Sequence, residues 1–204
     1  MKISVIGAAG MIGSQIVAEA TSRGLEVQAY TRSGNGVGEL PSQALDISDT
    51  AAVAKVVNDS DATVISVAGR DDYAAVVAAH KALIEAKPAG RMVVIGGAGS
   101  LQVGEGRLLE TPGFPAEYLP ESTAFSTVLD LYRAADGIDW TLVAPSPVIA
   151  PGKRTGYVTA LDTPAGGFVS TQDFAEAIVD ELQNPAHKGR RFTVASADEA
   201  VAQS

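Results

Sequence analysis

The chain has 204 residues, of which 46% are hydrophobic and 19% are charged, and its formal net charge is −9. This composition is that of a folded protein with one sizeable core, and it argues against disorder. The negative charge disfavours nucleic acid and anionic lipid as partners. Cysteine is absent and there are two histidines, so disulfides and thiolate metal sites are excluded and we expect no metal site.

The N-terminal segment Met1–Gly7 runs directly into a glycine-rich motif. Its apolar run is interrupted at Ser4 and Gly7, whereas a signal peptide needs an apolar stretch of about 7–15 residues. No part of the sequence reaches the roughly 18 uninterrupted apolar residues of a membrane-spanning helix. We therefore expect a cytoplasmic protein that does not associate with membranes.

Short apolar segments alternate with helical patterns along the chain, as is typical of βαβ units. The expected strands cover residues 3–6, 27–30, 62–68, 92–95, 140–144 and 191–195, with two short ones at 155–160 and 167–170. The expected helices cover residues 12–23, 71–86, 122–135 and 174–182, and a further helix is capped by Ser48 or Asp49. The tail after Asp198 is expected to fray. This order predicts the α/β class, with a doubly wound parallel sheet (Rossmann fold) in a single domain over residues 1–204.

Two segments interrupt the alternation. Residues 100–121 are rich in glycine and proline, and we expect them to form a long irregular loop, which is unusual in a compact domain unless it has a function. Several prolines also follow the fifth main strand. We expect a small portion of the chain, about residues 145–172, to cover a substrate.

The sequence Gly7-Ala8-Ala9-Gly10-Met11-Ile12-Gly13 lies between the first strand and the first helix, where a dinucleotide-binding loop is found. The first glycine permits the tight turn, the second lets the backbone approach the pyrophosphate, and the third lets the helix pack closely on the strand. The N-terminus of the helix supplies free N–H groups and partial positive charge for the phosphates. The alternative is a plain glycine-rich turn. We predict that the cofactor is bound here by Gly7, Ala9, Gly10, Met11, Ile12 and Gly13.

The residues after the second strand bear on which nucleotide is bound. About 20 residues beyond the loop, NAD-dependent enzymes place an Asp or Glu that binds the ribose 2′-hydroxyl. This chain has Thr31, Arg32 and Ser33 there, so no carboxylate repels a 2′-phosphate, and the Arg32 guanidinium can bind one through charged hydrogen bonds. The alternative is an ordinary exposed arginine. We predict that NADP(H) is preferred over NAD(H).

The spacing G-x-x-G-x-x-G resembles that of the extended and atypical short-chain dehydrogenase/reductase superfamily. Further segments are similar to its NADH-flavin reductase group, which belongs to the NAD(P)H-binding domain family related to biliverdin reductase B. These are VVIGGAGSL at 93–101, TPGFPAEY at 111–118, DWTLVAPSP at 139–147 and RFTV at 191–194. The resemblance covers nearly the whole chain. It implies that Asp46 and Ile47 contact adenine, that Ala68 and Gly69 form a small-residue turn under the adenosine ribose, and that a flavin is a substrate.

The chain departs from the wider superfamily in one respect. Typical members use Tyr-x-x-x-Lys as proton donor and cofactor anchor. Tyrosines occur here at positions 30, 73, 118, 132 and 157, and none is followed by lysine four residues later. The mechanism based on that pair is therefore absent, which disfavours both carbonyl reduction by that route and sugar epimerisation.

The carboxyl ends of the fourth and fifth main strands bring Gly97, Ser100 and Pro145 to the edge of the sheet where doubly wound folds bind ligands. We expect the nicotinamide there, with Phe114 and Tyr118 as an aromatic wall for the substrate. Ser100 and Tyr118 are the candidate catalytic residues. Alternatively, Ser100 only caps a glycine-rich turn and Tyr118 packs within its own loop.

The favoured function is that of an NAD(P)H-dependent oxidoreductase whose partner is a small molecule such as a flavin or a quinone. Such acceptors take hydride readily, so proximity and orientation could suffice without a strong acid. One alternative is a non-catalytic redox sensor that binds NADP(H), and another is an epimerase or dehydratase. The sequence sets no oligomeric state.

Overall fold

The computed structural model describes residues 1–69 and 72–204. Its strands are β1 (Lys2–Ile6), β2 (Glu26–Thr31), β3 (Ser42–Ala44), β4 (Ala62–Ile65), β5 (Met92–Ile95), β6 (Gln102–Val103), β7 (Gly106–Arg107), β8 (Trp140–Pro145), β9 (Val148–Ala150), β10 (Tyr157–Ala160), β11 (Phe168–Ser170) and β12 (Arg190–Ser196). Its α-helices are α1 (Met11–Ser22), α2 (Thr50–Asn58), α3 (Tyr73–Ala86), α4 (Leu119–Arg133), α5 (Thr171–Gln183) and α6 (Glu199–Ala202). Three short 3₁₀ helices are η1 (Ala98–Ser100), η2 (Leu108–Glu110) and η3 (Ala116–Tyr118).

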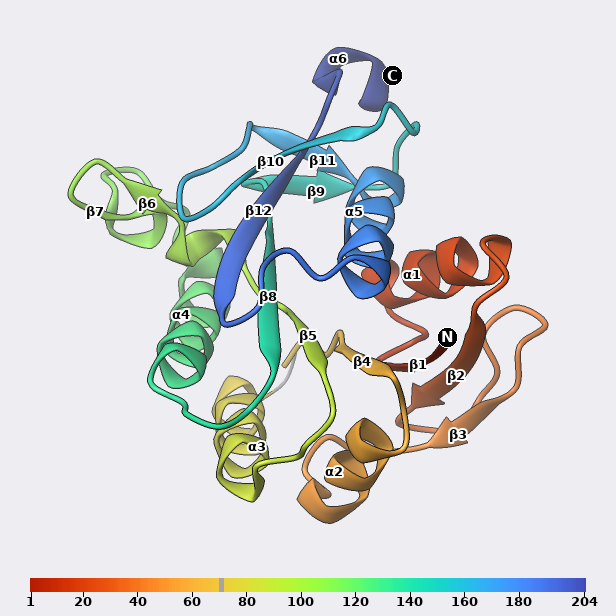
Figure 1. The fold of residues 1–204 in the computed structure, drawn as a ribbon. Coiled ribbons are helices and arrows are strands. Elements are labelled where there is room, and N and C mark those ends of the chain that lie inside the picture. The colour runs from red at the N-terminus through yellow and green to blue at the C-terminus, as the bar shows by residue number, and fades with distance from the viewer. Residues whose placement is uncertain (70–71) are drawn as a thin grey trace.

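An eight-stranded sheet, in the order β10-β12-β8-β5-β4-β1-β2-β3, forms the centre of the molecule. Its neighbouring strands are parallel except for the antiparallel pair β10–β12. Helices α2, α3 and α4 cover one face, and α1 and α5 cover the other (Figure 1). Because β1 lies between β2 and β4, the strand order changes direction at β1 and β4. The doubly wound Rossmann fold predicted from the sequence is therefore confirmed.

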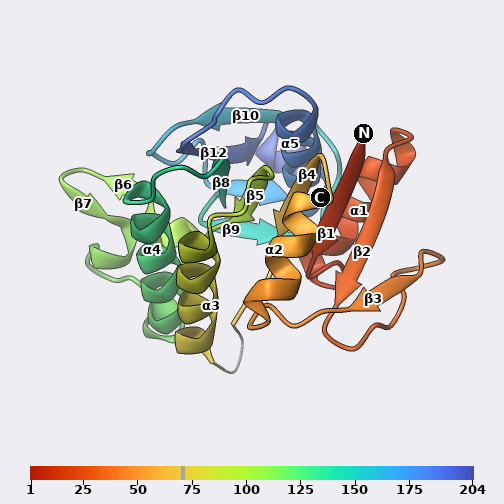
Figure 2. The same ribbon diagram turned by 60° about the horizontal axis from the view of Figure 1, so that its bottom comes forward.

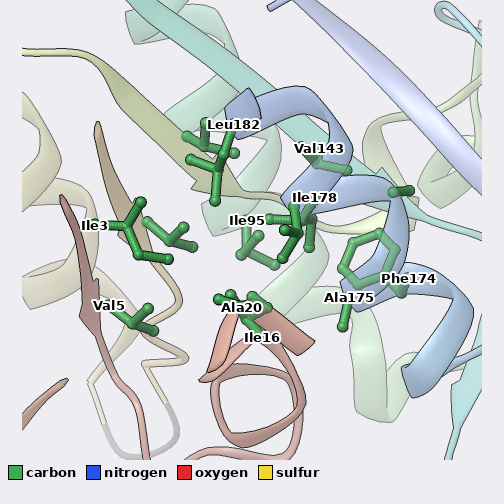
Figure 3. Packing of buried hydrophobic residues seen from close by; sticks show 14 of the residues in the cluster. Ile3, Val5, Ile16, Ala20, Ile95, Val143, Phe174, Ala175, Ile178 and Leu182 are labelled. Atoms are coloured by element: carbon green, nitrogen blue, oxygen red, sulfur yellow. The ribbon is translucent and has the colours of Figure 1, made fainter. Parts of the chain in front are cut away.

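The two faces of the sheet carry separate apolar layers because side chains alternate along each strand. Ile3 and Val5 of β1 point into the layer under α1 and α5, whereas Ile6 points into the layer under α2, α3 and α4. Helix α5 places Phe174 and Ile178, four residues apart, on its inner face (Figure 3). This spacing packs α5 beside α1, the helix that follows the glycine loop.

Several element boundaries differ from the sequence prediction. The strand expected over residues 62–68 ends at Ile65, where its register with β1 ends at Ile6 and β1 turns into the glycine loop; the Ser66 amide still donates to the Ile6 carbonyl. Helix α4 begins at Leu119 rather than at residue 122, since Pro120 fits the first helical turn, where no N–H is needed. Asp71, the expected start of the third helix, lies outside the described residues; Asp72 caps α3.

Strands β3 and β9 and helix α6 lie where the sequence predicted no regular element. Strands β3 and β9 have three residues each and no long apolar alternation. The expectation that the tail after Asp198 frays was wrong. Asp198 caps α6 through a 3.0 Å hydrogen bond from the Val201 amide, and Ala202 is fully buried. Tertiary contacts order the tail. The local sequence pattern cannot predict such contacts, so the expectation failed.

The segment 100–121 is less irregular than expected. It contains the β6–β7 hairpin and the short helices η2 and η3. Both views show the hairpin beside α4, at the opposite end of the molecule from β3 (Figures 1 and 2). The segment therefore forms a small lobe on the β12 side of the sheet.

Candidate functional site

The turns that follow the parallel strands meet at one edge of the sheet and are joined by backbone hydrogen bonds. The amides of Gly7 and Ala8, just after β1, donate to the carbonyl oxygen of Tyr30 on β2, at 3.0 and 3.1 Å. On the other side, the Ser66 amide donates to the Ile6 carbonyl at 2.8 Å. The turn after β1 is therefore fixed between its two neighbours, at the switch point where doubly wound sheets bind ligands.

Two glycines of the loop are required by the packing of the protein itself. Gly7 has a φ of +85°, and a Cβ built on it would lie 2.0 Å from the carbonyl oxygen of Ser66. A Cβ on Gly13 would lie 2.2 Å from the carbonyl oxygen of Gly7. Their absent side chains let α1 approach β1 and β4 closely, as the sequence predicts for the first and third glycines.

Gly10 is less constrained than Gly7 and Gly13 by the described residues around it. Its φ of −71° and ψ of 166° suit any residue, and an added Cβ would meet only the Gly7 carbonyl oxygen, at 3.3 Å. Gly10 is also the N-cap of α1, where no side chain caps the helix and the first turn holds no acidic residue. The first-turn N–H groups at Met11 and Ile12 thus lack intrahelical partners. This cradle, which a side chain would fill, fits a bound phosphate group.

Three other helices, α2, α3 and α5, begin differently, whereas α4 resembles α1 in that its N-cap, Tyr118, makes no side-chain capping bond. Asp49, Asp72 and Ser170 cap α2, α3 and α5 through side-chain hydrogen bonds to backbone amides. These oxygens satisfy donors that α1 leaves open. Ala9 and Met11 are exposed beside the open N-terminus of α1.

The residues after β2 form a loop that side-chain hydrogen bonds hold in place. The buried Thr31 hydroxyl donates to the carbonyl oxygen of Asn35 at 3.2 Å, and Ser42 on β3 donates to the same oxygen at 2.6 Å. Arg32 and Ser33 are exposed on this loop. Among the residues that the structure describes, no carboxylate forms an ion pair with Arg32. Its guanidinium is thus available to an anion.

Asp46 is the carboxylate that influences this loop. Hydrogen bonds from the backbone amide and the hydroxyl of Ser48, at 2.9 and 2.7 Å, hold the pKa of Asp46 below its usual value, and the charge of Arg32 adds a smaller effect. The Asp46 side chain is exposed, and the half-buried Ile47 packs on the core under α2. The sequence did not reveal that Asp46 comes within electrostatic reach of Arg32.

The turn after β4 carries Ala68, which is exposed, and Gly69, which is buried. A Cβ on Gly69 would lie 2.7 Å from Cγ2 of Val76 on α3, so packing against α3 already accounts for this glycine. The predicted ribose contact of these two residues stays a prediction.

At the carboxyl end of β5, Gly97 leads into η1. The Ser100 hydroxyl donates to the Gly97 carbonyl oxygen at 3.2 Å and also accepts from Arg191 Nη1 at 2.9 Å. Ser100 is 4% exposed, so its hydroxyl is engaged inside the protein. Pro145 ends β8 and pairs with Val194 of β12. These contacts place Ser100 as the link of a turn, while its predicted catalytic role stays a prediction.

The two aromatic residues of the predicted substrate wall lie in the lobe after η1. Phe114 is half-buried, and Tyr118 is 57% exposed at the start of α4. Within residues 1–69 and 72–204, no side chain or backbone group bonds to the Tyr118 hydroxyl. Tyr118 is therefore open to a ligand, but the protein does not hold its hydroxyl in one orientation.

Sequence reasoning missed two groups of charged residues that the structure brings together. One is Arg191 with Asp162. The other is Glu19 of α1, which is 6% exposed and accepts hydrogen bonds from Arg23 and Arg154. Burial raises the pKa of Glu19, but the two guanidiniums outweigh burial and lower it overall. The only sequence signal for these pairs is a charged residue inside an otherwise apolar segment.

Two other kinds of site are absent from the described part of the chain. None of its helices is long and apolar enough to cross a membrane. Within the same residues, no three His, Cys, Asp or Glu side chains come together in a group that could hold a metal ion.

Comparisons with known proteins agree with this geometry. The sequence profile of a family described as NAD(P)H-binding matches residues 7–185. The chain is 37% identical to the YwnB protein of Bacillus subtilis (strain 168), over 96% of this chain and 99% of that protein. It is 31% identical to a solved protein of Streptococcus pneumoniae TIGR4 assigned as an NADH-flavin reductase, with a TM-score of 0.85 over 96% of this chain and 99% of the other. It is 29% identical to a solved protein of Bacteroides thetaiotaomicron assigned as an epimerase, with a TM-score of 0.83 over 97% of both chains.

Proposed function

The chain belongs to the NAD(P)H-binding family, and from this premise we propose that it is an NADPH-dependent oxidoreductase that transfers hydride to a flavin, a quinone or a similar conjugated small molecule. Its likeness to the Streptococcus protein assigned as an NADH-flavin reductase supports this choice of acceptor. The missing Tyr-x-x-x-Lys pair argues against an epimerase, the assignment of the Bacteroides relative.

The observation that carries the proposal is the open cradle at Gly10. Gly7 is required by its positive φ and by packing, and Gly13 by packing, whereas the backbone angles of Gly10 suit any residue and its Cβ would make one tight contact, at 3.3 Å. A phosphate seated against the uncapped N-terminus of α1 would need the space that a side chain at Gly10 would take. The first-turn amides would then donate to its oxygens.

The choice of NADPH rests on Arg32 and Ser33. Both are exposed on a loop that Thr31 and Ser42 hold in place, and a guanidinium there can donate two hydrogen bonds to a 2′-phosphate. The ionised Asp46 opposes this preference in part, since its charge lies within reach of Arg32. We propose that Arg32 outweighs Asp46 because the guanidinium has no ion-pair partner among the described carboxylates.

The chemistry follows from what the chain can supply. A bound NADPH would provide the hydride, and the residues at the ends of β5 and β8 would hold its nicotinamide end beside the acceptor. The segment 145–172 and the aromatic pair Phe114 and Tyr118 would cover the acceptor and exclude water. A conjugated acceptor needs little acid catalysis, which suits a site where the Ser100 hydroxyl is already bonded to Gly97.

Steady-state oxidation of NADPH, measured against FMN, riboflavin and quinones, tests the proposal. We expect turnover above the uncatalysed background with at least one acceptor, and loss of turnover in Gly10→Val. Binding of NADPH without oxidation by any acceptor would contradict an enzymatic function and favour a redox sensor. Failure to bind either nucleotide would contradict the assignment of the site.

A further inference from the structure

Arg191 is an internal arginine on β12 that joins two distant segments of the chain. It is 2% exposed, and its register with Leu142 directs its side chain to the α4 side of the sheet. Its Nη1 donates to the carbonyl oxygen and the hydroxyl of Ser100, at 2.8 and 2.9 Å. Its Nη2 donates to the backbone carbonyl and the carboxylate of Asp162, both at 2.8 Å, and its Nε donates to the same carboxylate at 3.0 Å. One guanidinium therefore links η1 to the loop between β10 and β11.

Burying Arg191 costs desolvation free energy that a purely structural role does not explain well. Arg191 shares the Oδ1 atom of Asp162 with a second arginine, Arg133, whose Nη2 lies 2.6 Å from it. Burial lowers the pKa of Arg191, and the charges of Arg133 and Arg107 lower it further, against the opposing effect of Asp162. A well-packed apolar residue often stabilises a protein as well as a buried ion pair does. Stability alone thus gives a weak reason for a buried arginine at this position.

Ser100 connects Arg191 to the turn at Gly97. The hydroxyl proton of Ser100 points to the Gly97 carbonyl oxygen at 3.2 Å, while a lone pair accepts from Arg191. Gly97 directly follows Gly96, whose amide donates to the Val143 carbonyl at 2.9 Å. A chain of hydrogen bonds thus runs from Arg191 through Ser100 to the turn at the carboxyl end of β5.

The other arm of Arg191 reaches the segment 145–172. Its partner Asp162 also accepts from the Gln102 amide, at 2.8 Å, through its backbone carbonyl. Ser100, Gln102, Asp162 and Arg191 line a cavity of about 260 Å³ beside this junction. The cavity is not itself a candidate anion site, because its three arginines face as many carboxylates, namely Glu105, Glu110 and Asp162.

We propose that Arg191 is a positioning residue for hydride transfer: it fixes the Gly97 turn through Ser100 and holds the segment around Asp162 in a set relation to that turn. This inference rests on the proposed function, since it takes Gly97 to lie at the nicotinamide end of the site. It assigns Ser100 a connecting role instead of proton donation. Arg191 would act on the orientation of the nicotinamide and not on the adenosine half, which binds at the far side of the sheet switch point.

The test compares three variants with the wild type. Arg191→Met removes the charge at similar length, Arg191→Lys retains a donor, and Ser100→Ala removes the link alone. Arg133→Gln is the matched control, because Arg133 bonds to the same Asp162 oxygen but is exposed and forms no hydrogen bond with Ser100. We measure kcat, the KM for NADPH, the fluorescence enhancement of bound NADPH, the affinity for 2′-phospho-ADP-ribose, and Tm.

A misplacement of about 1 Å can cost about 100-fold in rate, so we expect kcat to fall by about that factor in Arg191→Met, less in Arg191→Lys, and not in Arg133→Gln. Affinity for 2′-phospho-ADP-ribose should stay at the wild-type value, because that probe lacks the nicotinamide. Unchanged kcat in a folded Arg191→Met, or in Ser100→Ala if the former does not fold, would overturn the inference. So would an equal loss of affinity for NADPH and for 2′-phospho-ADP-ribose.

A wild type that binds NADPH without turnover would refute the proposed function, and the binding measurements would still test the inference. Arg191→Met should then lose the fluorescence enhancement of bound NADPH while keeping its affinity for 2′-phospho-ADP-ribose. Unchanged enhancement would overturn the positioning role.

Discussion

At the scale of single residues, the proposed site rests on two groups that the described residues leave without partners. Gly10 leaves space that the fold does not need, and Arg32 leaves a charge that no described carboxylate pairs with. A glycine or an arginine whose role is structural shows the opposite pattern, as Gly13 and Arg91 do: the Arg91 guanidinium is buried against Asp139 and Glu181. This contrast separates the proposed binding positions from the packing positions of the same fold.

Gly10→Val should abolish dinucleotide binding and leave the fold intact. The backbone at Gly10 is open to any residue, but a branched side chain would occupy the place of the pyrophosphate. NADPH fluorescence enhancement measures binding, and circular dichroism measures folding. Gly13→Val is the contrasting variant and should destabilise the protein, because its Cβ would meet the Gly7 carbonyl at 2.2 Å. A folded Gly10→Val protein that still binds NADPH would refute the cofactor loop.

Arg32→Ala should weaken NADPH and leave NADH nearly unaffected. A charged hydrogen bond is worth about 1.5–3 kcal/mol, which corresponds to roughly 10- to 100-fold in affinity. Arg32→Asp should go further and favour NADH, since a carboxylate repels the 2′-phosphate and can accept from a 2′-hydroxyl.

Competitive titration of both nucleotides measures the effect. Arg190→Ala, which removes an exposed arginine at the start of β12, serves as the control and should change neither affinity. An equal loss of affinity for NADH and for NADPH in Arg32→Ala would show that Arg32 stabilises its loop and does not bind the 2′-phosphate.

Tyr118→Phe should lower turnover by about two orders of magnitude at most, the low end of a general-acid contribution. Tyr118 is 57% exposed and the protein gives its hydroxyl no fixed partner among the described residues, so it is poorly placed to deliver a proton to one position. The measurement is kcat at saturating NADPH and acceptor. A loss of about four orders would identify Tyr118 as a true proton donor.

At the scale of elements, short segments are ordered by what they touch. Helix α6 has four residues, too few to be stable alone, yet Ala202 is buried and its carbonyl accepts from the Lys153 amide at 2.9 Å. A Cβ on Gly152 would meet the same carbonyl at 2.2 Å, so the chain after β9 and α6 pack without room for a side chain. The C-terminus thereby holds the start of the segment 145–172.

Asp198→Ala should therefore lower the free energy of unfolding by about 1 kcal/mol, the usual effect of removing an N-cap side chain. Its carboxylate accepts from the Val201 amide at 3.0 Å. Urea denaturation gives the change, and Asp136→Ala, at an exposed position after α4, is the control. A variant with wild-type stability would mean that burial of Ala202 alone keeps α6 folded.

At the scale of the whole molecule, a buried histidine makes stability depend on pH. His80 on α3 is 1% exposed, and its Nδ1 lies 3.1 Å from the hydroxyl of Tyr132 on α4. Burial lowers the pKa of His80 from 6.5 to about 4. The unfolded chain therefore binds a proton at a pH where the folded chain does not, and stability falls as the pH drops from 6.5 towards 4.

Replacing His80 by Gln should remove this part of the pH dependence, because Gln does not titrate yet can still bond to Tyr132. Between pH 7 and pH 4 the wild type should lose about 3 kcal/mol more than His80→Gln. Urea denaturation at a series of pH values measures both curves. Parallel curves would show that His80 is protonated in the folded protein without cost.

The sequence by itself determined the parts of the molecule whose signals are local. The β1–loop–α1 unit is one of these, since an apolar strand, three spaced glycines and a helical pattern occur within a short stretch. The parallel core strands are others, because strands buried on both faces need continuous apolar runs. The secondary structure of these segments is encoded locally and depends little on which neighbours bury them.

The tertiary structure alone decided which distant residues meet. Arg191 and Ser100 are separated by 91 positions, and Arg154 and Glu19 by 135, so no local pattern could pair them. The same holds for β3 and α6, whose order comes from neighbours brought by the sheet and the core. The physical reason is that burial and hydrogen-bond partners are properties of the packed chain, whereas periodicity and turn chemistry belong to the segment itself.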